Sequence, residues 1–321
     1  MTGLLMNILL SVVGFAILIK CADYFVGGAS ALAKNLKVPT TVIGLTIVAF
    51  GTSAPEFAIS FNSHLSNNTD MLLGNVIGSN IANILVILGV AILIVPFKIH
   101  NNVIKKEIPI LLLITMGVSV LLLDGLFDST KLNTLTRNDG IILILFFTIF
   151  MYYLITILLN KTNKEEEIEK PKYKTPMSVI ITLFGLIGII FGSNLVVDNI
   201  AMFASSIGIS QKIIAITIVS IGTSLPELVT TITAARRGEN NMAIGNIVGS
   251  NVFNTCIVLG LPIVLLGEVT TIAFNIVDII FMLLSVVLLW IFSATDRELR
   301  RQEGVIFILM YCIYGTYIVL Q

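Results

Sequence analysis

The sequence predicts an all-α polytopic membrane protein with ten transmembrane helices in two inverted five-helix repeats, with broken helices at the centre. Three observations lead to this fold class. The 321 residues are 56% hydrophobic and only 12% charged, with a mean hydropathy of +1.00. Apolar stretches of membrane-spanning length recur from end to end. A polar motif that begins at Gly51 occurs a second time at Gly222.

Ten apolar stretches are each long enough to cross a hydrocarbon core of about 30 Å. They cover, approximately, residues 4–33, 39–64, 69–95, 103–124, 138–160, 175–206, 210–236, 239–266, 271–293 and 303–320. One connection, residues 161–174, is longer and polar and contains three consecutive glutamates. We therefore expect a first five-helix repeat (1–160), a cytoplasmic linker (161–174) and a second, inverted repeat (175–321), without a sizeable soluble domain.

Charge and cysteine content exclude several classes of function. The net charge is zero and gives no indication of a nucleic-acid partner. The three cysteines are far apart in apolar segments and show neither metal-ligand nor redox spacing. His64 and His100 are isolated near helix ends, where we expect surface positions. We expect contact with membrane lipid, no cofactor and no obligate protein partner.

Loop charges set the expected orientation, because cytoplasmic loops carry an excess of Lys and Arg. If the linker is cytoplasmic, its five lysines share that side with Lys34, Lys37, Lys98, Lys105, Lys106, Arg236, Arg237, Arg297, Arg300 and Arg301. The opposite side holds only Lys131, Arg137 and Lys212. Both termini are then expected outside the cell. The compact length and the absence of a presequence favour a prokaryotic cell membrane.

An internal repeat appears when the sequence is shifted by 171 residues, so that 44–89 falls on 215–260 without a gap. The shift aligns Gly51-Thr-Ser-Ala-Pro-Glu56 with Gly222-Thr-Ser-Leu-Pro-Glu227. Five spans separate the copies, an odd number, so the second copy must enter the membrane upside down. Inverted repeats with broken helices near the midplane are typical of secondary transporters.

The first copy of the motif combines a broken helix with oxygen ligands. Pro55 removes a backbone donor and clashes with the preceding turn, which frees carbonyls around Ala49 to Thr52. Exposed backbone at membrane depth is tolerated only where it lines a cavity or is buried in protein. Thr52, Ser53 and Glu56 add hydroxyl and carboxylate oxygens. Such hard donors suit Ca²⁺ or Na⁺ and are poor ligands for zinc or copper.

The second copy supplies the same chemistry from the other half of the chain. It offers Thr223, Ser224 and Glu227, with carbonyls around Ser220. Two carboxylates brought together are neutralised by one divalent cation or by two monovalent cations. Intramembrane ionisable residues are functional by default. We therefore expect a cation site at the contact between the two repeats.

The second part of each repeat reads Gly-Asn-x-x-Gly-Ser-Asn, which spaces small residues one turn apart and lets helices approach closely. Asn75, Asn80, Asn246 and Asn251 are interpreted mainly as helix-packing residues. The pairs Ser79 with Asn83 and Ser250 with Asn254 are in register with the glutamates, and we expect these four to face the site. Outside the motifs, Lys20 and Asp23 are three residues apart on the first helix, where they can pair with each other.

These motifs resemble the α-repeats of the cation/calcium exchanger superfamily, in particular the prokaryotic sodium/calcium exchangers. The resemblance covers the ten-span layout, and its specific part is the doubled motif in 44–89 and 215–260. It implies sodium/calcium antiport by alternating access, in which the first and sixth helices slide across the remaining bundle. Na⁺ and Ca²⁺ are the transported ions, and no enzymatic activity is expected.

The resemblance also implies a set of ion ligands. Glu56, Glu227, Thr52 and Thr223 would form a central Ca²⁺ site. One Na⁺ site would use Ser53, Ser250, Glu227 and the carbonyl of Ser220, and its mirror would use Ser224, Ser79, Glu56 and the carbonyl of Ala49. Asn83 and Asn254 complete the centre. Several related exchangers carry Asp at the position of Asn254, and Ser220 replaces a small apolar residue often found there.

Three alternatives compete with sodium/calcium antiport. Calcium/proton antiport could use Glu56 and Glu227 as the protonated groups, although proton-coupled relatives usually have a different glutamate motif. A passive cation channel would place both repeats along one continuous pore. An intramembrane enzyme with two acidic residues is disfavoured, because the two carboxylates sit in mirror-related frames rather than in distinct acid and base environments.

Overall fold

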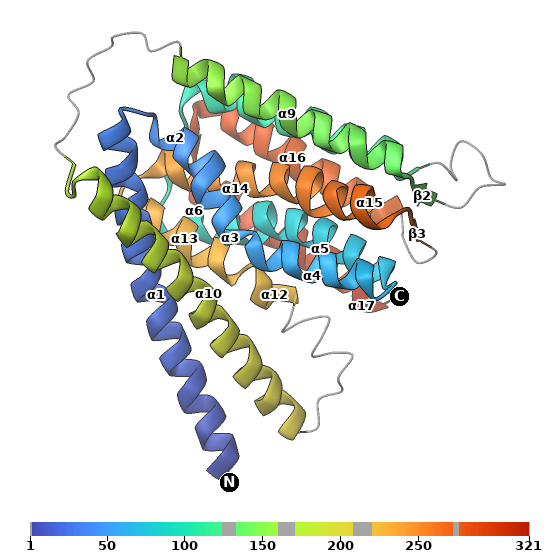
Figure 1. The fold of residues 1–321 in the computed structure, drawn as a ribbon, viewed down its shortest axis with the longest axis horizontal. Helices are drawn as coiled ribbons and strands as arrows, with labels where there is room; N and C mark the ends of the chain where they lie inside the picture. Colours follow the sequence, from blue (N-terminus) through green and yellow to red (C-terminus); the bar gives the residue numbers. More distant parts are fainter. Residues whose placement is uncertain (1, 124–132, 160–170, 208–219, 272–275, 321) are drawn as a thin grey trace.

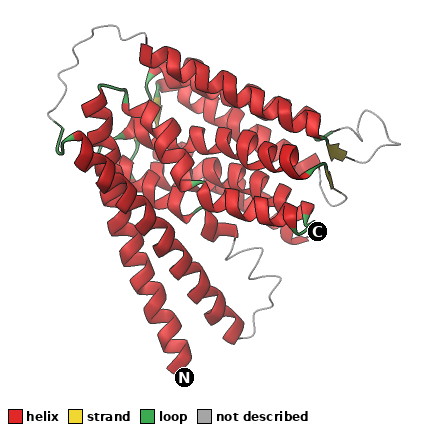
Figure 2. Cartoon of the chain, viewed as in Figure 1, coloured by secondary structure: helices red, strands yellow, loops and turns green. Residues whose placement is uncertain are grey.

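A computed structural model describes residues 2–123, 133–159, 171–207, 220–271 and 276–320. The described part of the chain is predominantly helical, with two pairs of very short strands (Figure 2). Six helices in it have the length and hydropathy of a membrane span, and the bent pair 40–52 and 54–65 makes a seventh. The prediction of a mainly helical membrane protein is therefore confirmed.

The first half of the chain precedes the linker. Its elements are α1 (Thr2–Leu36), α2 (Thr40–Ile43), the π-helical η1 (Gly44–Val48), α3 (Ala49–Thr52), α4 (Ala54–Leu65), α5 (Thr69–Ala82), η2 (Asn83–Leu88), α6 (Gly89–Ile94), β1 (Phe97–Lys98), η3 (Val103–Glu107), α7 (Ile108–Leu121), β2 (Asn133–Leu135) and α9 (Arg137–Leu159).

The second half follows a similar order. Its elements are α10 (Thr175–Ser206), α12 (Ser220–Thr223), α13 (Leu225–Arg236), α14 (Asn240–Phe253), η5 (Asn254–Leu259), α15 (Gly260–Leu266), β3 (Val269–Thr271), α16 (Ile276–Asp296), β4 (Glu298–Leu299) and α17 (Arg301–Leu320). Of the predicted spans, 103–124 falls on η3 and α7, 303–320 falls on α17, and residues 210–219 of the seventh lie outside the described residues.

Element boundaries recur at the sequence offset of 171 residues. Helix α4 and helix α13 begin at Ala54 and Leu225, and α5 and α14 begin at Thr69 and Asn240. The π-helical segments η2 and η5 begin at the two equivalent asparagines, Asn83 and Asn254. Wide π-helical turns are uncommon and occur frequently at functional sites. The repeated sequence therefore folds into the same local structure twice.

Both motif helices break at the serine that lies two residues before the proline. Ser53 and Ser224 have nearly the same backbone conformation, with φ and ψ of −83° and 9° and of −89° and 5°. In the first copy the two helical parts meet at a bend of 47°. In the second copy Pro226 cannot donate to the Gly222 carbonyl one turn earlier, and the Ser193 hydroxyl of α10 donates to it instead, at 2.9 Å.

The most buried spans are those that come next in the chain after each broken helix, Thr69–Ile94 and Asn240–Leu266. In the span Thr69–Ile94, 67% of the most apolar window is buried inside the protein, and in Asn240–Leu266 the value is 78%. The corresponding value for α9 is 17%, and Figure 1 shows this helix along one edge of the bundle. His64 is also buried, in the last turn of α4, so the predicted surface position is wrong. Helix α4 packs against α5, η5 and α15.

Helices α1 and α10 lie side by side along most of their length and cross the remaining helices at an angle (Figure 1). Glycines allow this close approach. A Cβ atom added at Gly185 would lie 2.5 Å from the Phe25 backbone nitrogen, and one at Gly28 would lie 2.6 Å from the Thr182 hydroxyl oxygen. The two backbones are therefore in contact through small residues on both helices.

Polar contacts attach α1 to the segment between α13 and α14. The Arg237 guanidinium donates from Nε to Asp23 at 2.8 Å and also from its second nitrogen. The Ser30 hydroxyl donates to Glu239. Lys20 lies over the Tyr24 ring, 5.3 Å from its centroid, so it is Arg237 that pairs with Asp23 rather than Lys20. A guanidinium can give two hydrogen bonds to one carboxylate, which favours this partner.

The strand pairs join the two halves. Strand β1 pairs antiparallel with β4, with Phe97 opposite Leu299. Strand β2 pairs antiparallel with β3, with Thr134 opposite Thr270. Each pair therefore links a connection of the first half to a connection of the second half.

Replacing Gly185 by alanine should separate α1 and α10, because the added methyl group meets backbone atoms of Phe25 that cannot move independently. Overpacking of this kind costs about 1–3 kcal/mol. The expected result is a lower midpoint of thermal unfolding of the purified protein in detergent. Gly315→Ala on α17 is the matched control, since a Cβ there meets nothing within 4 Å. Equal midpoints for the two variants would contradict the tight helix contact.

Candidate functional site

Glu56 and Glu227 occupy equivalent positions just after the two breaks. Each is the third residue of its helix, behind an alanine or leucine and the motif proline. The first turn of a helix favours a negative charge, because its backbone N–H groups point toward that end. Both side chains are buried, at 1% and 0% exposure. The breaks thus deliver two carboxylates to the protein interior.

Hydrogen bonds connect each glutamate to the break of the other half. The Ser53 hydroxyl donates to Glu227 Oε1 at 2.8 Å. The Ser224 hydroxyl donates to Glu56 Oε1 at 3.4 Å. The structure therefore brings the two motifs together, as the repeat predicts, and each half completes the surroundings of the other half's carboxylate.

Several oxygens of this cluster have no hydrogen-bond partner among the described residues. They include the second carboxylate oxygens, Oε2 of Glu56 and Oε2 of Glu227. At the start of the two π-helical segments, the Asn83 side-chain oxygen and both amide atoms of Asn254 are likewise buried without a partner among the described residues. No described Lys, Arg or His forms an ion pair with either glutamate. Burying uncompensated carboxylates is costly, so this cluster is suited to a positive ligand.

The hydroxyl groups of the two motifs are buried as well. Thr52 is fully buried, and its hydroxyl lies 3.3 Å from the Ala49 carbonyl. The Ser250 hydroxyl lies 3.5 Å from the same carbonyl. Ser79 and Thr223 are buried as well. The side chain of Ser220 lies outside the described residues.

The Ala49 carbonyl lies on a different side of the cluster from the one expected. The resemblance groups it with Ser224, Ser79 and Glu56, but the structure places it beside Ser250. The reason is local, because the Ser53 backbone N–H donates to this carbonyl at 3.0 Å within one helical turn. Ala49 therefore belongs with Ser53, whose hydroxyl contacts Glu227.

The remaining motif asparagines form hydrogen bonds between helices, as their packing interpretation predicts. Asn75 Nδ2 donates to the Ser60 hydroxyl at 2.9 Å and to the Glu56 carbonyl at 3.1 Å. Asn246 Nδ2 donates to the Thr231 hydroxyl at 2.9 Å. The Asn80 amide donates to the Thr255 hydroxyl at 2.8 Å, and the Asn83 amide donates to the Asn251 side-chain oxygen at 2.9 Å. The Asn251 amide donates to the Asn80 backbone carbonyl at 3.2 Å.

Sequence reasoning missed two further buried or half-buried carboxylates. Glu107 accepts a hydrogen bond from the Tyr153 phenol at 2.6 Å, and Asp278 accepts one from Tyr314 at 3.0 Å. The signal was present in the sequence, since Glu107 and Asp278 are separated by the same 171 residues as the motif glutamates. Each pair ties neighbouring helices together. Neither carboxylate belongs to the Glu56 and Glu227 cluster by any hydrogen bond between described residues.

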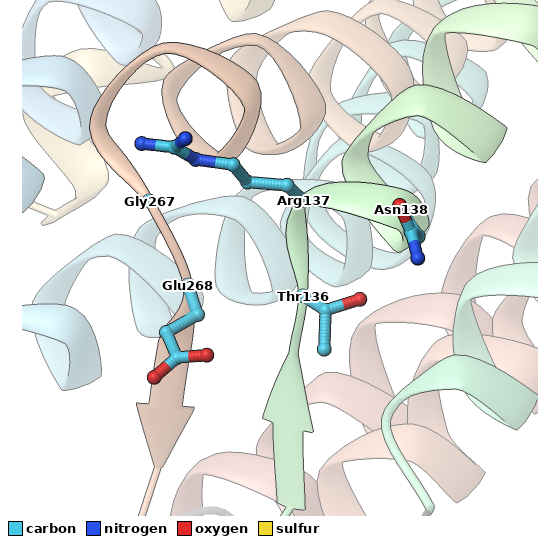
Figure 3. Close-up of a pocket in the computed structure, with 5 residues that line it drawn as sticks. All are labelled: Thr136, Arg137, Asn138, Gly267 and Glu268. Carbon is cyan, nitrogen blue, oxygen red and sulfur yellow. The ribbon is translucent and has the colours of Figure 1, made fainter.

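An open surface pocket of about 440 Å³ lies where β2 meets α9 and α15 meets β3. It is lined by Thr136, Arg137, Asn138, Gly267 and Glu268, and Figure 3 shows Arg137 extending toward the Gly267 segment. None of its lining residues belongs to the carboxylate cluster. Its lining includes one basic and one acidic side chain, Arg137 and Glu268.

The carboxylate cluster presents carboxylate, hydroxyl, carbonyl and amide oxygens, which are ligands for hard cations such as Na⁺ and Ca²⁺. Groups of three or more His, Cys, Asp and Glu side chains able to hold a metal ion are absent among the described residues. Zinc and copper sites generally need such nitrogen and sulfur ligands. The two motifs supply oxygen atoms, the ligand type that alkali and alkaline-earth cations prefer.

Comparison with known proteins agrees with this chemistry. The sequence profile of the sodium/calcium exchanger protein family matches residues 6–156 and 177–320. The chain is 35% identical over 291 residues to the inner membrane protein YrbG of Escherichia coli strain K12, covering 86% of this chain and 87% of YrbG. It is 31% identical over 345 residues to the sodium/calcium exchanger MaX1 of Methanosarcina acetivorans, covering 96% and 97%.

The fold is also found among solved structures. The sodium-calcium exchanger NCX_Mj, soaked with 10 mM Na⁺ and zero Ca²⁺, matches with a TM-score of 0.84 and 28% sequence identity. The match covers 98% of this chain and 99% of that chain. The family profile matches most of the chain, and the fold match extends over nearly all of it. The chain therefore belongs to the sodium/calcium exchanger family of membrane transporters.

Proposed function

We propose that this protein is a secondary active antiporter that exchanges Na⁺ for Ca²⁺ by alternating access and extrudes Ca²⁺ from the cell. Proteins of this family transport Na⁺ and Ca²⁺ and need no cofactor. One observation carries the proposal for this chain. Two buried carboxylates from the two halves meet through Ser53 and Ser224, and each keeps one oxygen without a partner among the described residues.

In this proposal Ca²⁺ binds at the centre between Glu56 and Glu227, with oxygens of Thr52 and Thr223 as further ligands. A divalent cation neutralises both carboxylates at once. Asn83 and Asn254 complete the centre, because each has a buried side-chain oxygen that no described residue binds.

Two flanking Na⁺ sites would share the same carboxylates. One comprises Ser53, Ser250, Glu227 and the Ala49 carbonyl, as supported by the contact between Ser250 and that carbonyl. Its mirror comprises Ser224, Ser79, Glu56 and the Ser220 carbonyl. Na⁺ and Ca²⁺ then compete for Glu56 and Glu227, and this competition couples the two fluxes. A site that binds either ion set in turn provides exchange without a second, separate binding region.

The ten-helix, inverted-repeat architecture is part of this proposal. Residues 1–160 and 175–321 would be the two five-helix repeats and 161–174 the linker. Support comes from the element boundaries that recur after 171 residues and from the strand pairs, each of which joins one half to the other. An inverted relation lets the two halves present equivalent ligands to one midplane site while facing opposite sides of the membrane.

We further propose a cell-membrane location with both termini outside, supported by the distribution of Lys and Arg and by the relative named as an inner membrane protein. Arg137→Cys and Lys172→Cys, each in a background lacking Cys21, Cys256 and Cys312, test this topology. A membrane-impermeant maleimide should label Arg137→Cys in intact cells, and Lys172→Cys only after permeabilisation. The reverse labelling pattern would overturn the orientation.

The coupling ion is tested with purified protein in vesicles loaded with Ca²⁺. An opposing Na⁺ gradient at constant pH should drive Ca²⁺ efflux, because Na⁺ must replace Ca²⁺ at the shared carboxylates. A pH gradient at constant sodium should not. Efflux driven by pH alone would favour calcium/proton antiport, and Ca²⁺ flux that needs no counter-ion would favour a channel.

Glu56→Gln and Glu227→Gln should each abolish Ca²⁺ transport while folded protein remains in the membrane. Each change leaves Ca²⁺ with half of its counter-charge, and losing one partner of a buried pair costs about 3–5 kcal/mol, or at least about 100-fold in affinity. Glu268→Gln in the surface pocket is the matched control and should transport normally. Retained transport in both motif variants would remove the assigned site.

A further inference from the structure

Asn246 is a buried side chain that bridges the two halves next to the proposed ion ligands. It lies on α14 and is 1% exposed. Its Nδ2 donates to the Thr231 hydroxyl at 2.9 Å, one turn beyond Glu227 on α13. Its Oδ1 lies 3.3 Å from the Thr52 hydroxyl, which belongs to the other motif. One amide therefore links the helix that carries one glutamate to a proposed Ca²⁺ ligand from the opposite half.

A hydroxyl group that binds a cation must direct a lone pair at the ion and its hydrogen elsewhere, since it has one donor hydrogen and two acceptor lone pairs. Three acceptors lie near the Thr52 hydroxyl. These are the Ala49 carbonyl and the Asn246 amide oxygen, both at 3.3 Å, and the Glu227 carboxylate. Two of them, the Ala49 carbonyl and Glu227, are themselves proposed ion ligands. Of these three acceptors, only the Asn246 oxygen can accept the hydrogen bond from Thr52 without using an oxygen that is itself a proposed ion ligand.

The orientation of the Asn246 amide follows from its equivalent in the first half. Asn75 donates to the carbonyl of Glu56, an acceptor that cannot donate, so the Asn75 nitrogen must face that side. The same nitrogen donates to Ser60, the residue that aligns with Thr231. Asn246 contacts Thr231 in the same way at the same distance of 2.9 Å. Its nitrogen thus faces Thr231, and its oxygen faces Thr52.

We propose that Asn246 is a positioning residue for ion binding, which accepts the Thr52 hydrogen and turns the Thr52 oxygen toward the cation. This inference rests on the proposed function. Asn246 is not itself a ligand in it, and its effect on Ca²⁺ passes through Thr52. Thr231 has a subsidiary role, because it anchors the nitrogen end of the amide.

Kinetics of Ca²⁺ transport in vesicles test the proposal with Asn246→Leu, which keeps a similar volume and removes both hydrogen bonds. The expected result is a rise of about fivefold in the KM for Ca²⁺, as for the loss of one hydrogen bond, with a smaller change in the maximal rate. Thr231→Val should raise the KM in the same direction by a smaller factor. The control Asn80→Leu removes a buried 2.8 Å hydrogen bond to Thr255 and should leave the KM unchanged.

The decisive comparison uses Thr52→Val, which keeps the backbone carbonyl but has no hydroxyl to orient. In that background Asn246→Leu should raise the KM no further, because its effect acts through the Thr52 hydroxyl, which is then absent. The double-mutant cycle of the two substitutions measures this coupling. An undiminished effect of Asn246→Leu on top of Thr52→Val would overturn the inference. A wild-type KM in Asn246→Leu would also overturn the inference. If the leucine variant does not fold, a wild-type KM in Thr231→Val would overturn it instead. Absence of Ca²⁺ transport by the wild-type protein would instead overturn the proposed function.

Discussion

Two carboxylates buried at one place, where no described basic side chain pairs with them, are the constraint on which the rest of this structure depends. A carboxylate in the protein interior is costly unless it is paired or fully hydrogen-bonded. Glu56 and Glu227 each receive a serine hydroxyl from the other motif and retain an oxygen that no described residue binds. A permanent Lys or Arg would satisfy them but would also occupy the site. A cation that enters and leaves satisfies the same requirement while remaining exchangeable, which is what transport demands.

The broken helices are the local means of meeting this constraint. Each break leaves a helix N-terminus pointing at its own glutamate and frees carbonyls of the preceding turn for other partners. In the second half, Ser193 of α10 occupies one such carbonyl, that of Gly222. Helix α10 therefore contacts the break itself, and its close partner α1 is bound through Asp23 to Arg237 beyond the end of α13. The helix pair α1 and α10 is thus connected to the break before Glu227 and to the segment after α13. A shift of this pair relative to α13 would alter both contacts.

Much of the fold could be predicted from the sequence, because apolar length and the positions of Gly and Pro act locally. Where the structure describes them, the predicted spans fall on helices, and the doubled motif brings Ser53 to Glu227 as the repeat requires. Contacts that depend on how the two halves pack could not be predicted. The partner of Asp23 is Arg237, 214 residues away in the sequence, and not the nearby Lys20. The two-residue strand β1 of the first half likewise pairs with β4 near the end of the second half. The contact between the Ala49 carbonyl and Ser250 of the other half is likewise a matter of how the two halves pack.

The proposed function requires one divalent cation to bind between Glu56 and Glu227. A crystal structure of the protein with Ca²⁺ and without Na⁺ would locate this ion by its anomalous scattering. We expect a single Ca²⁺ at about 2.3–2.6 Å from carboxylate oxygens of both glutamates. A Ca²⁺ bound by only one of these carboxylates, or bound at another place with both carboxylates unligated, would contradict it.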